Sequence, residues 1–359
     1  KSNSFCTLLV GDMEKELPPP ETFGVLSTIK VPVKEGGEHI YAVAFSPDGK
    51  FLAATFGNGS LRVFDAESFA SIQRAKLGSG FDDLPSTGVA WRPPHEESEE
   101  GIYELVTISS VGAVFGWNFD VSDPDASYLD RVWKCVEEGN ETAAVDFAPD
   151  GSLFATVGSD RIVRTYNPST RKLVDKLDKG KDDAGHTRPA HTNRIFSVRF
   201  VTPHLILTGG WEAPVQVWDI RTGYSERQVV GPQISSDGIE TTNGSQSFIT
   251  VSKRDSRQLQ VWDFLSGREH EQESEKLSAN VGKNALIAAR FSPDASTVWT
   301  ATSKPDELLC IDSNTGAVKG HIGGGHFGNI LCLQRCPTKP YRIVLGSMKE
   351  GLYVVDCQS

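Results

Sequence analysis

Side chains that support catalysis or metal binding are present, but their spacing does not bring them together. The eight histidines include no pair two or four residues apart. Gly323 to Gly328 resembles a phosphate-binding loop in glycine content alone, because the Lys and Ser/Thr of such a loop do not follow. The six cysteines include no Cys-x-x-Cys pair of the kind found in zinc sites. The sequence therefore predicts a protein that is not an enzyme and has no metal and no cofactor.

Basic side chains recur in short polar turns between strand-like segments. Converging cations would suit an acidic or phosphorylated segment, because arginine binds carboxylate and phosphate groups through two parallel hydrogen bonds. A second interpretation is a set of solvated turns without a partner, since Asp160, Asp255 and Glu350 lie among these cations. The candidate partner-binding cations are Arg161, Lys253, Arg254, Arg257, Lys304 and Lys349.

Three aromatic side chains lie near the same turns. Trp211 precedes Pro214 in a turn and either covers its own unit or stands at the rim as a binding anchor. Tyr41 and Phe196 begin corresponding strands, and strand alternation directs both toward the same mouth. We therefore predict Tyr41, Phe196 and Trp211 as partner-binding residues together with the six cations.

Two groups of glutamates offer the opposite chemistry. Glu96, Glu97, Glu99 and Glu100 lie in an enlarged turn. Glu269, Glu271, Glu273 and Glu275 are spaced two residues apart, which on a strand places four carboxylates on one side. Charge of this kind keeps an outer strand from pairing with other chains. The alternative role of both groups is to bind a basic tail.

These residues are positioned by a repeat. An alternating strand that ends in a large residue followed by Asp or Asn occurs seven times, with steps of 53, 49, 52, 44, 49 and 44 residues. Repeats of this length are typical of a β-propeller, in which stacked four-stranded blades bury one another's faces. The residues that mark the repeat are Phe64, Trp117, Tyr166, Trp218, Trp262, Ile311 and Val355.

The repeat predicts an all-β chain with one seven-bladed propeller of four-stranded antiparallel blades. Residues 1–21, which contain three consecutive prolines, form a lead-in, and residues 22–359 form the propeller. The last blade has only three strands of its own, so we expect residues 22–33 to supply its outer strand and close the ring. The predicted blades are 40–77, 87–137, 140–177, 191–230, 237–277, 284–319, and 326–357 together with 22–33.

The repeat resembles that of the WD-repeat family. Val217-Trp218-Asp219 and Val261-Trp262-Asp263 end in the Trp-Asp pair, and His191 opens a blade 27 residues ahead of Trp218. The resemblance covers residues 22 to 357 and implies a rigid platform that binds peptides or domains at the rim of its channel. The family's His–Ser/Thr–Asp–Trp network is mostly absent: blade four has His191, Ser197 and Trp218 but no Asp in its middle turn.

Composition narrows the function further. The net charge of −11 argues against binding of duplex nucleic acid, and no apolar run approaches the length of a membrane span. Cysteines within strand patterns indicate reduced thiols, hence an intracellular protein of the cytoplasm or nucleus. We expect a non-catalytic protein–protein interaction scaffold, a monomeric ring within a larger complex. The alternatives are a reader of acidic, phosphorylated or basic tails and, last, an enzyme that uses the channel.

Overall fold

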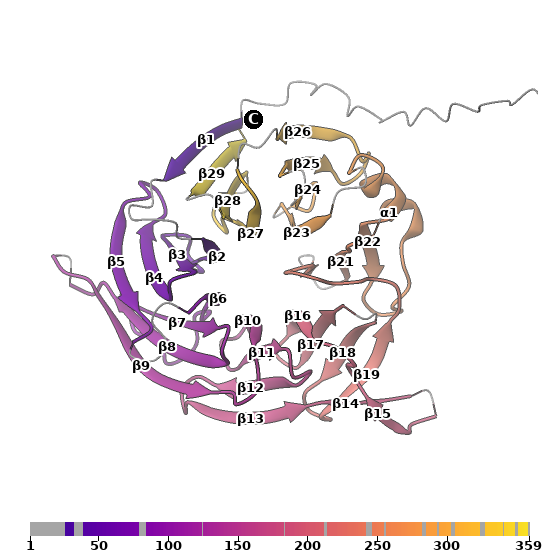
Figure 1. Cartoon of the computed structure of the whole chain (residues 1–359), viewed down its shortest axis with the longest axis horizontal. Helices are drawn as coiled ribbons and strands as arrows, with labels where there is room; N and C mark the ends of the chain where they lie inside the picture. Colours follow the sequence, from indigo (N-terminus) through magenta and orange to yellow (C-terminus); the bar gives the residue numbers. More distant parts are fainter. Residues whose placement is uncertain are drawn as a thin grey trace, which may run out of the picture.

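The described strands form seven sheets that stand around a central channel (Figure 1). The computed structural model describes residues 26–31, 39–78, 84–123, 125–182, 184–211, 214–241, 246–254, 256–281, 285–292, 294–302, 306–323, 327–339, 341–348 and 351–357. The first strand of each blade lies nearest the channel and the last lies at the outer edge (Figure 1). The predicted seven-bladed all-β propeller is confirmed.

The strands follow one another in chain order within almost every blade. Blade one contains β2 (Ile40–Phe45), β3 (Phe51–Phe56), β4 (Ser60–Asp65) and β5 (Ser71–Lys76), and blade two contains β6 (Ser86–Trp91), β7 (Ile102–Ser109), β8 (Ala113–Asp120) and β9 (Tyr128–Val136). Blade three contains β10 (Thr142–Phe147), β11 (Phe154–Gly158), β12 (Val163–Asn167) and β13 (Lys172–Leu177), and blade four contains β16 (Ile195–Thr202), β17 (Leu205–Gly210), β18 (Val215–Asp219) and β19 (Tyr224–Val229). Blade five contains β20 (Ile239–Thr241), β21 (Ser247–Val251) and β22 (Leu259–Asp263), and blade six contains β23 (Leu286–Phe291), β24 (Thr297–Thr302), β25 (Leu308–Asp312) and β26 (Val318–Ile322). Blade seven contains β27 (Ile330–Arg335), β28 (Arg342–Ser347), β29 (Leu352–Cys357) and β1 (Leu26–Val31).

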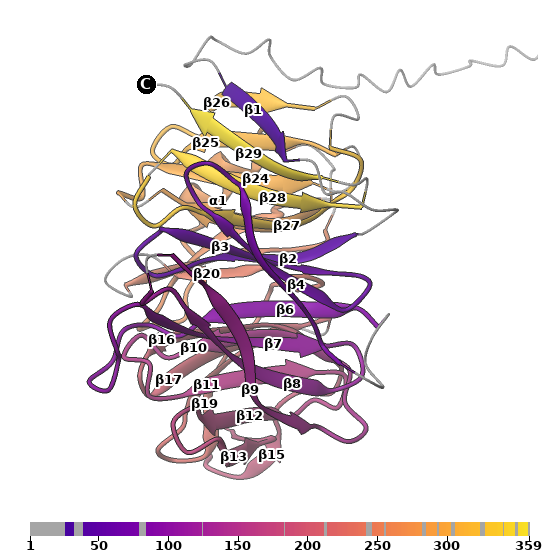
Figure 2. The same ribbon diagram turned by 90° about the vertical axis from the view of Figure 1, so that its left-hand side faces the viewer.

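The ring closes through a strand from near the start of the chain. Strand β1 pairs antiparallel with β29, from Leu26 opposite Cys357 to Val31 opposite Leu352, and the two strands lie side by side at the top of Figure 2. The predicted closure by an N-terminal strand is confirmed. This pairing covers the edge of β29 that would otherwise expose unpaired backbone groups.

The hydrophobic core lies between the blades. One buried cluster joins Leu61 and Val63 of blade one to Phe115 and Trp117 of blade two. Another joins blade one to blade seven across the closure, and a third joins blades six and seven. A single blade therefore has no core of its own, as expected of a repeat that buries its faces only by stacking.

The turn Ser46-Pro47-Asp48-Gly49, which joins the first two strands of blade one, has the hydrogen bonds that its residue types favour. In blade one, Ser46 Oγ donates to Asp48 Oδ1 at 2.7 Å, and Gly49 adopts a φ of +71°. Blade six repeats the bond between Ser292 and Asp294, with Ala295 at a φ of +56° in the position of the glycine. The side-chain bond thus specifies the turn even where the flexible residue is missing.

Blade four carries an additional hairpin. Strands β14 (Lys179–Lys181) and β15 (Thr187–Pro189) come from the long polar insert that precedes this blade. Strand β14 pairs in parallel with β19, so the sheet has six strands. The hairpin therefore covers the outer edge of blade four.

Blade five differs from the prediction at its outer edge. Helix α1 (Glu271–Ser278) follows β22 where we expected an outer strand with a stripe of four glutamates, so that expectation was wrong. Side chains two residues apart share one side on a strand but point in different directions on a helix. Glu269 precedes the helix and forms an ion pair with Arg257, with an N–O distance of 2.6 Å.

Two serines of α1 make the hydrogen bonds that a fourth strand would make. The backbone N–H of Val261 donates to Ser274 Oγ at 2.9 Å, and that of Leu259 donates to Ser278 Oγ at 3.1 Å. Ser278 Oγ in turn donates to the Leu259 carbonyl at 2.8 Å. Ser274 is fully buried, so the edge of β22 is protected from solvent.

Replacing Ser274 by Ala is expected to destabilise the protein by about 1–3 kcal/mol, because the Val261 N–H would remain buried without an acceptor. Chemical denaturation gives the free energy of unfolding. Glu273→Ala, an exposed position on the same helix, is the control and should change it by less than about 0.5 kcal/mol. Equal effects of the two substitutions would show that the serine does not replace a strand hydrogen bond.

Candidate functional site

A cavity of about 560 Å³ opens into the channel from the side where the middle turns gather. Tyr41 and Phe196 both line it, in the shared mouth that strand alternation predicted, together with Thr87, Ser110 and Glu141. These residues come from blades one to four, so the mouth is built by neighbouring blades rather than by one loop.

Trp211 extends this mouth with an exposed aromatic surface. Its ring centroid lies 5.6 Å from that of Phe196, and 51% of Trp211 is exposed. The Arg194 guanidinium lies 5.9 Å from the centroids of both rings and bonds Glu141 Oε2 at 3.2 Å. Trp211 therefore stands at the rim, and a planar cation and two aromatic rings meet there.

None of the four predicted cations within the described residues lines this cavity. Arg161 and Lys253 are exposed and Arg254 is half-buried, but none of the three lines it. Arg257 is engaged by Glu269 of its own blade. Lys304 and Lys349 lie outside the described residues, so convergence of cations from blades five to seven stays a prediction.

One position of each inner strand lies at the channel. Strand alternation alone does not identify this position. In each blade, the strand register pairs the residue at this position with the equivalent residue of the second strand, which gives one residue from each of the seven blades. The signal in the sequence is the residue that follows the central apolar position, as in Val145-Asp146-Phe147 and Val198-Arg199-Phe200. We name the set the channel ring, and in blade order it consists of Ala44, Ala90, Asp146, Arg199, Glu240, Arg290 and Gln334.

The charged members of the channel ring form a network with Asp237, which precedes β20. Arg199 Nη2 lies 2.7 Å from both carboxylate oxygens of Asp237, and Arg290 Nη2 bonds the same carboxylate. Glu240 lies within 4.0 Å of guanidinium nitrogens of Arg199, Arg290 and Arg335. Inner strands of blades four to seven are thereby linked around the channel.

Two carboxyl groups of this network titrate differently. Burial would raise the pKa of Asp237, but Arg199 and Arg290 outweigh burial and hold that pKa at about 2. Burial raises the pKa of Asp146 to about 6, although Arg199 and the Phe200 amide both lower it. Asp146 Oδ2 accepts the Phe200 N–H at 2.7 Å, and no cation within the described ranges forms an ion pair with it.

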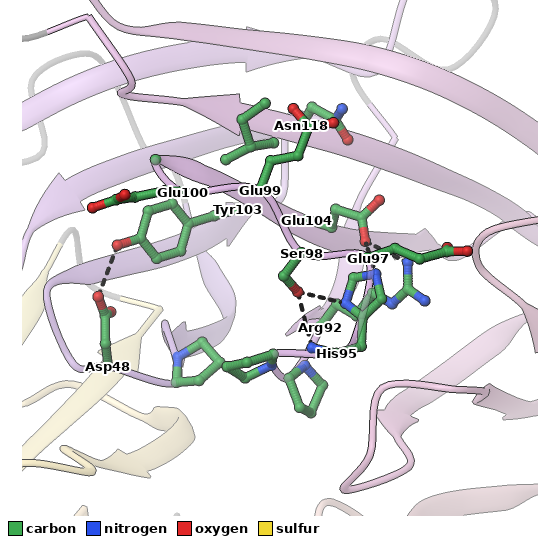
Figure 3. Close-up of a pocket in the computed structure, with 15 residues that line it drawn as sticks. Asp48, Arg92, His95, Glu97, Ser98, Glu99, Glu100, Tyr103, Glu104 and Asn118 are labelled. Carbon is green, nitrogen blue, oxygen red and sulfur yellow. Dashed lines mark hydrogen bonds and ion pairs between the residues drawn. The ribbon is translucent and has the colours of Figure 1, made fainter.

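A second cavity, of about 440 Å³, lies under the enlarged turn of blade two (Figure 3). Tyr103 donates to Asp48 at 2.7 Å on one side of it, and Glu97, Glu99 and Glu100 line its other walls (Figure 3). Three of its carboxylates come from the predicted acidic turn, so this turn encloses a space rather than only facing solvent.

Ser98, His95 and Glu104 in this cavity do not have the geometry of a catalytic triad. His95 Nδ1 bonds Ser98 Oγ at 2.7 Å, but Ser98 Oγ also accepts the backbone N–H of His95, as in a local turn. Glu104 lies 3.9 Å from His95 and is bonded instead to Arg92 at 2.5 Å. The described residues include no group of three or more side chains arranged to hold a metal ion.

The family model for the WD domain, G-beta repeat, matches residues 30–65 and 133–167. Seven blades in a closed ring agree with this match. Two segments of the chain match the WD repeat, and the chain folds as a seven-bladed β-propeller. Among the described residues, no helix is long and apolar enough to cross a membrane.

Other WD-repeat relatives match at low identity. A ribosome biogenesis protein WDR12 homolog of Drosophila yakuba is 24% identical over 141 residues, covering 38% of this chain and 32% of the relative. A periodic tryptophan protein 2 homolog of Caenorhabditis elegans is 20% identical over 229 residues, covering 64% of this chain and 22% of the relative. Protein tipD of Dictyostelium discoideum is 19% identical over 172 residues, covering 48% of this chain and 25% of the relative. The chain thus spans about a third or less of the length of these relatives.

The WD-repeat hydrogen-bond network is present in altered form. In blade four, His191 Nε2 and Trp218 Nε1 both bond Thr208 Oγ1 at 2.7 Å, so Thr208 takes the place expected for Ser197. In blade three, the buried Glu137 replaces the histidine and accepts hydrogen bonds from Thr156 at 2.5 Å and Tyr166 at 2.8 Å. The network therefore survives where its usual residue types do not.

The buried imidazole gives a stability that depends on pH. Burial, reinforced by Arg188, lowers the pKa of His191 from 6.5 to about 3, so the folded protein favours the neutral ring. Its contribution is fully present above pH 6.5 and is lost as pH falls toward 3. Asp146 acts oppositely, since its raised pKa makes the ionised form unfavourable above pH 6.

We therefore expect the wild type to lose stability relative to His191→Gln as pH falls from 7 to 4.5. Chemical denaturation at a series of pH values measures the difference in the free energy of unfolding. His204→Gln replaces an exposed histidine and is the control, which should change the free energy of unfolding little. A constant difference for His191→Gln would contradict a buried neutral imidazole.

Proposed function

We propose that this WD-repeat propeller is a non-catalytic protein-interaction scaffold within a larger assembly. The observation that carries the proposal is the open mouth lined by Tyr41 and Phe196, with Trp211 half exposed beside it. Exposed aromatic side chains next to a cavity are typical anchors of protein interfaces. A rigid ring presents such anchors without first having to order a loop.

The names of the relatives support an assembly of a particular kind. The WDR12 homologs are described as ribosome biogenesis proteins, and several of them match this chain. We propose by analogy that this ring is one subunit of a ribosome-forming particle, as a monomer in the complex and within the nucleus. Its partners would then be proteins that meet the channel mouth, rather than duplex nucleic acid, which the net charge of −11 disfavours.

The cavity under the enlarged turn of blade two favours a second candidate, the binding of a basic tail. Glu97, Glu99 and Glu100 line this cavity, and Glu99 and Glu100 lie near the Tyr103 ring (Figure 3). Charge complementarity between these carboxylates and a basic segment would weaken as salt concentration rises.

Trp211→Ala is expected to weaken capture of the main partner at least about tenfold, because truncated aromatic anchors commonly account for that much affinity. Affinity capture from native extract with quantitative mass spectrometry identifies the partner, and titration with the purified partner gives the dissociation constant. Leu265→Ala is the control, since that side chain is 81% exposed and lies outside the cavity.

Arg254→Glu distinguishes binding of the partner at the aromatic mouth from binding at the basic turns. Because Arg254 does not line the cavity, its charge reversal should leave the partner bound. Loss of the partner with Arg254→Glu and retention with Trp211→Ala would replace the aromatic mouth by the basic turns as the binding surface.

A further inference from the structure

The channel ring is uneven in size. Blades one and two contribute Ala44 and Ala90, whereas blades three to six contribute Asp146, Arg199, Glu240 and Arg290. Long side chains therefore lie on one side of the channel ring, and two small side chains lie on the other. The cavity at the mouth reaches this level, because Ala44, Ala90 and Asp146 are among its lining residues. A further cavity of about 420 Å³ also has Ala44 and Gln334 among its lining residues, together with Pro47 and Pro337.

The charged side chains that line the cavity at the mouth also differ in whether they have an ion-pair partner. Arg199 is engaged through both oxygens of Asp237, and Arg194 at the mouth is bonded to Glu141. Asp146 lines the same cavity and has one hydrogen bond, from the Phe200 amide, without an ion pair to the described residues. Strand β6 on the adjacent blade brings no charged residue toward it. Arg199 acts on Asp146 through its charge but is bonded to Asp237, and burial still raises the pKa of Asp146, so a second cation placed beside Asp146 would be stabilised.

The walls above Asp146 suit a long, thin side chain. Tyr41 and Phe196 line this cavity together with Asp146, and Ala44 and Ala90 are among its apolar lining residues. Apolar walls of this kind pack against the methylene stem of lysine or arginine while the charged end continues to a polar group. The aromatic rings at the mouth add a favourable contact for a cation passing between them. An acidic side chain would instead meet Asp146, with both lining arginines already paired.

We propose that the channel receives a lysine or arginine side chain from the partner segment held at the mouth, and that Asp146 pairs with its charged end. This rests on the proposed function and adds the chemistry of the partner, a segment with one basic side chain free to enter the ring. Trp211 and Phe196 would hold the backbone of that segment, and the alanines of blades one and two would admit the stem.

Binding should then depend on pH through Asp146. The groups that face this carboxyl are Arg199, Asp237 and Glu240 and the Phe200 amide, and its pKa in the free protein is about 6. A proton on Asp146 competes with the cationic side chain, so affinity falls as pH falls through 6. With Asp146→Asn the affinity should be low and nearly independent of pH between 7.5 and 5.

The test uses random peptides displayed on phage and selected on the immobilised full chain at pH 7.5. The expected result is enrichment of Lys or Arg at one fixed position. For a synthetic selected peptide, fluorescence anisotropy should show that norleucine at that position, which keeps the stem and removes the charge, weakens binding about tenfold or more. The same replacement should have little effect on Asp146→Asn. Ala90→Leu, which narrows the cavity and keeps the carboxylate, should also abolish the preference for a basic residue.

Matched controls separate this proposal from the proposed function. Asp150→Asn removes an exposed carboxylate from a turn of the same blade and should leave binding unchanged. Melting temperatures establish that each variant is folded. Peptides whose binding needs Trp211 but is indifferent to Asp146→Asn, or selected peptides without a fixed basic residue, would overturn the channel assignment alone. Failure to select any peptide would overturn the peptide-binding mouth as well. Butylamine binding as tightly as the peptide would assign the cavity to free amines instead.

Discussion

The faces of each sheet are buried only against the neighbouring sheets, since the hydrophobic clusters cross from blade to blade. Phe115 and Trp117 of blade two pack with Leu61 and Val63 of blade one, and the cluster around Val344 and Val354 continues from blade seven into blade one. A gap anywhere in the ring would expose two such faces at once. This explains why the last blade takes β1 from the opposite end of the chain and why a blade as short as blade five is retained in the ring.

The outer edges meet a different requirement, that of pairing or covering backbone groups, and the blades meet it by different means. Blade seven uses a distant strand, blade four uses the hairpin of β14 and β15, and blade five uses two serine hydroxyls from a helix. In the helix, serines four residues apart lie on the same side, which matches alternate N–H groups of β22 at Leu259 and Val261. An outer edge can therefore be covered by a strand, a hairpin or a helix, provided that the element supplies hydrogen-bonding groups.

This difference explains what could be predicted from the sequence. Stacking faces impose alternation on every unit, and each marked strand ends in a large residue followed by Asp or Asn. The blade number and the closure could therefore be inferred from residues such as Trp218 and Trp262. At the edge of blade five, the sequence needs to supply only two hydroxyl groups. The glutamate spacing at 269–275 fits a strand as well as it fits a helix. The aromatic mouth was accessible because Tyr41 and Phe196 occupy equivalent strand positions. The channel ring was not recognised because each blade contributes one residue, and its meaning emerges only when seven registers are superposed.

The channel ring also shows how charge can be placed inside a propeller without losing the ring. Buried ion pairs seldom stabilise more than well-packed apolar side chains, but removing one partner is strongly destabilising. Two carboxylates of the network have more than one cationic partner. Asp237 bonds two arginines, and Glu240 lies within ion-pair distance of three. Apolar residues at these positions would fill the channel without directional bonds, whereas guanidinium and carboxylate groups fix which inner strand faces which. Ala44 and Ala90 carry no charge, so this layer links the inner strands of blades four to seven and leaves blades one and two outside the charged network.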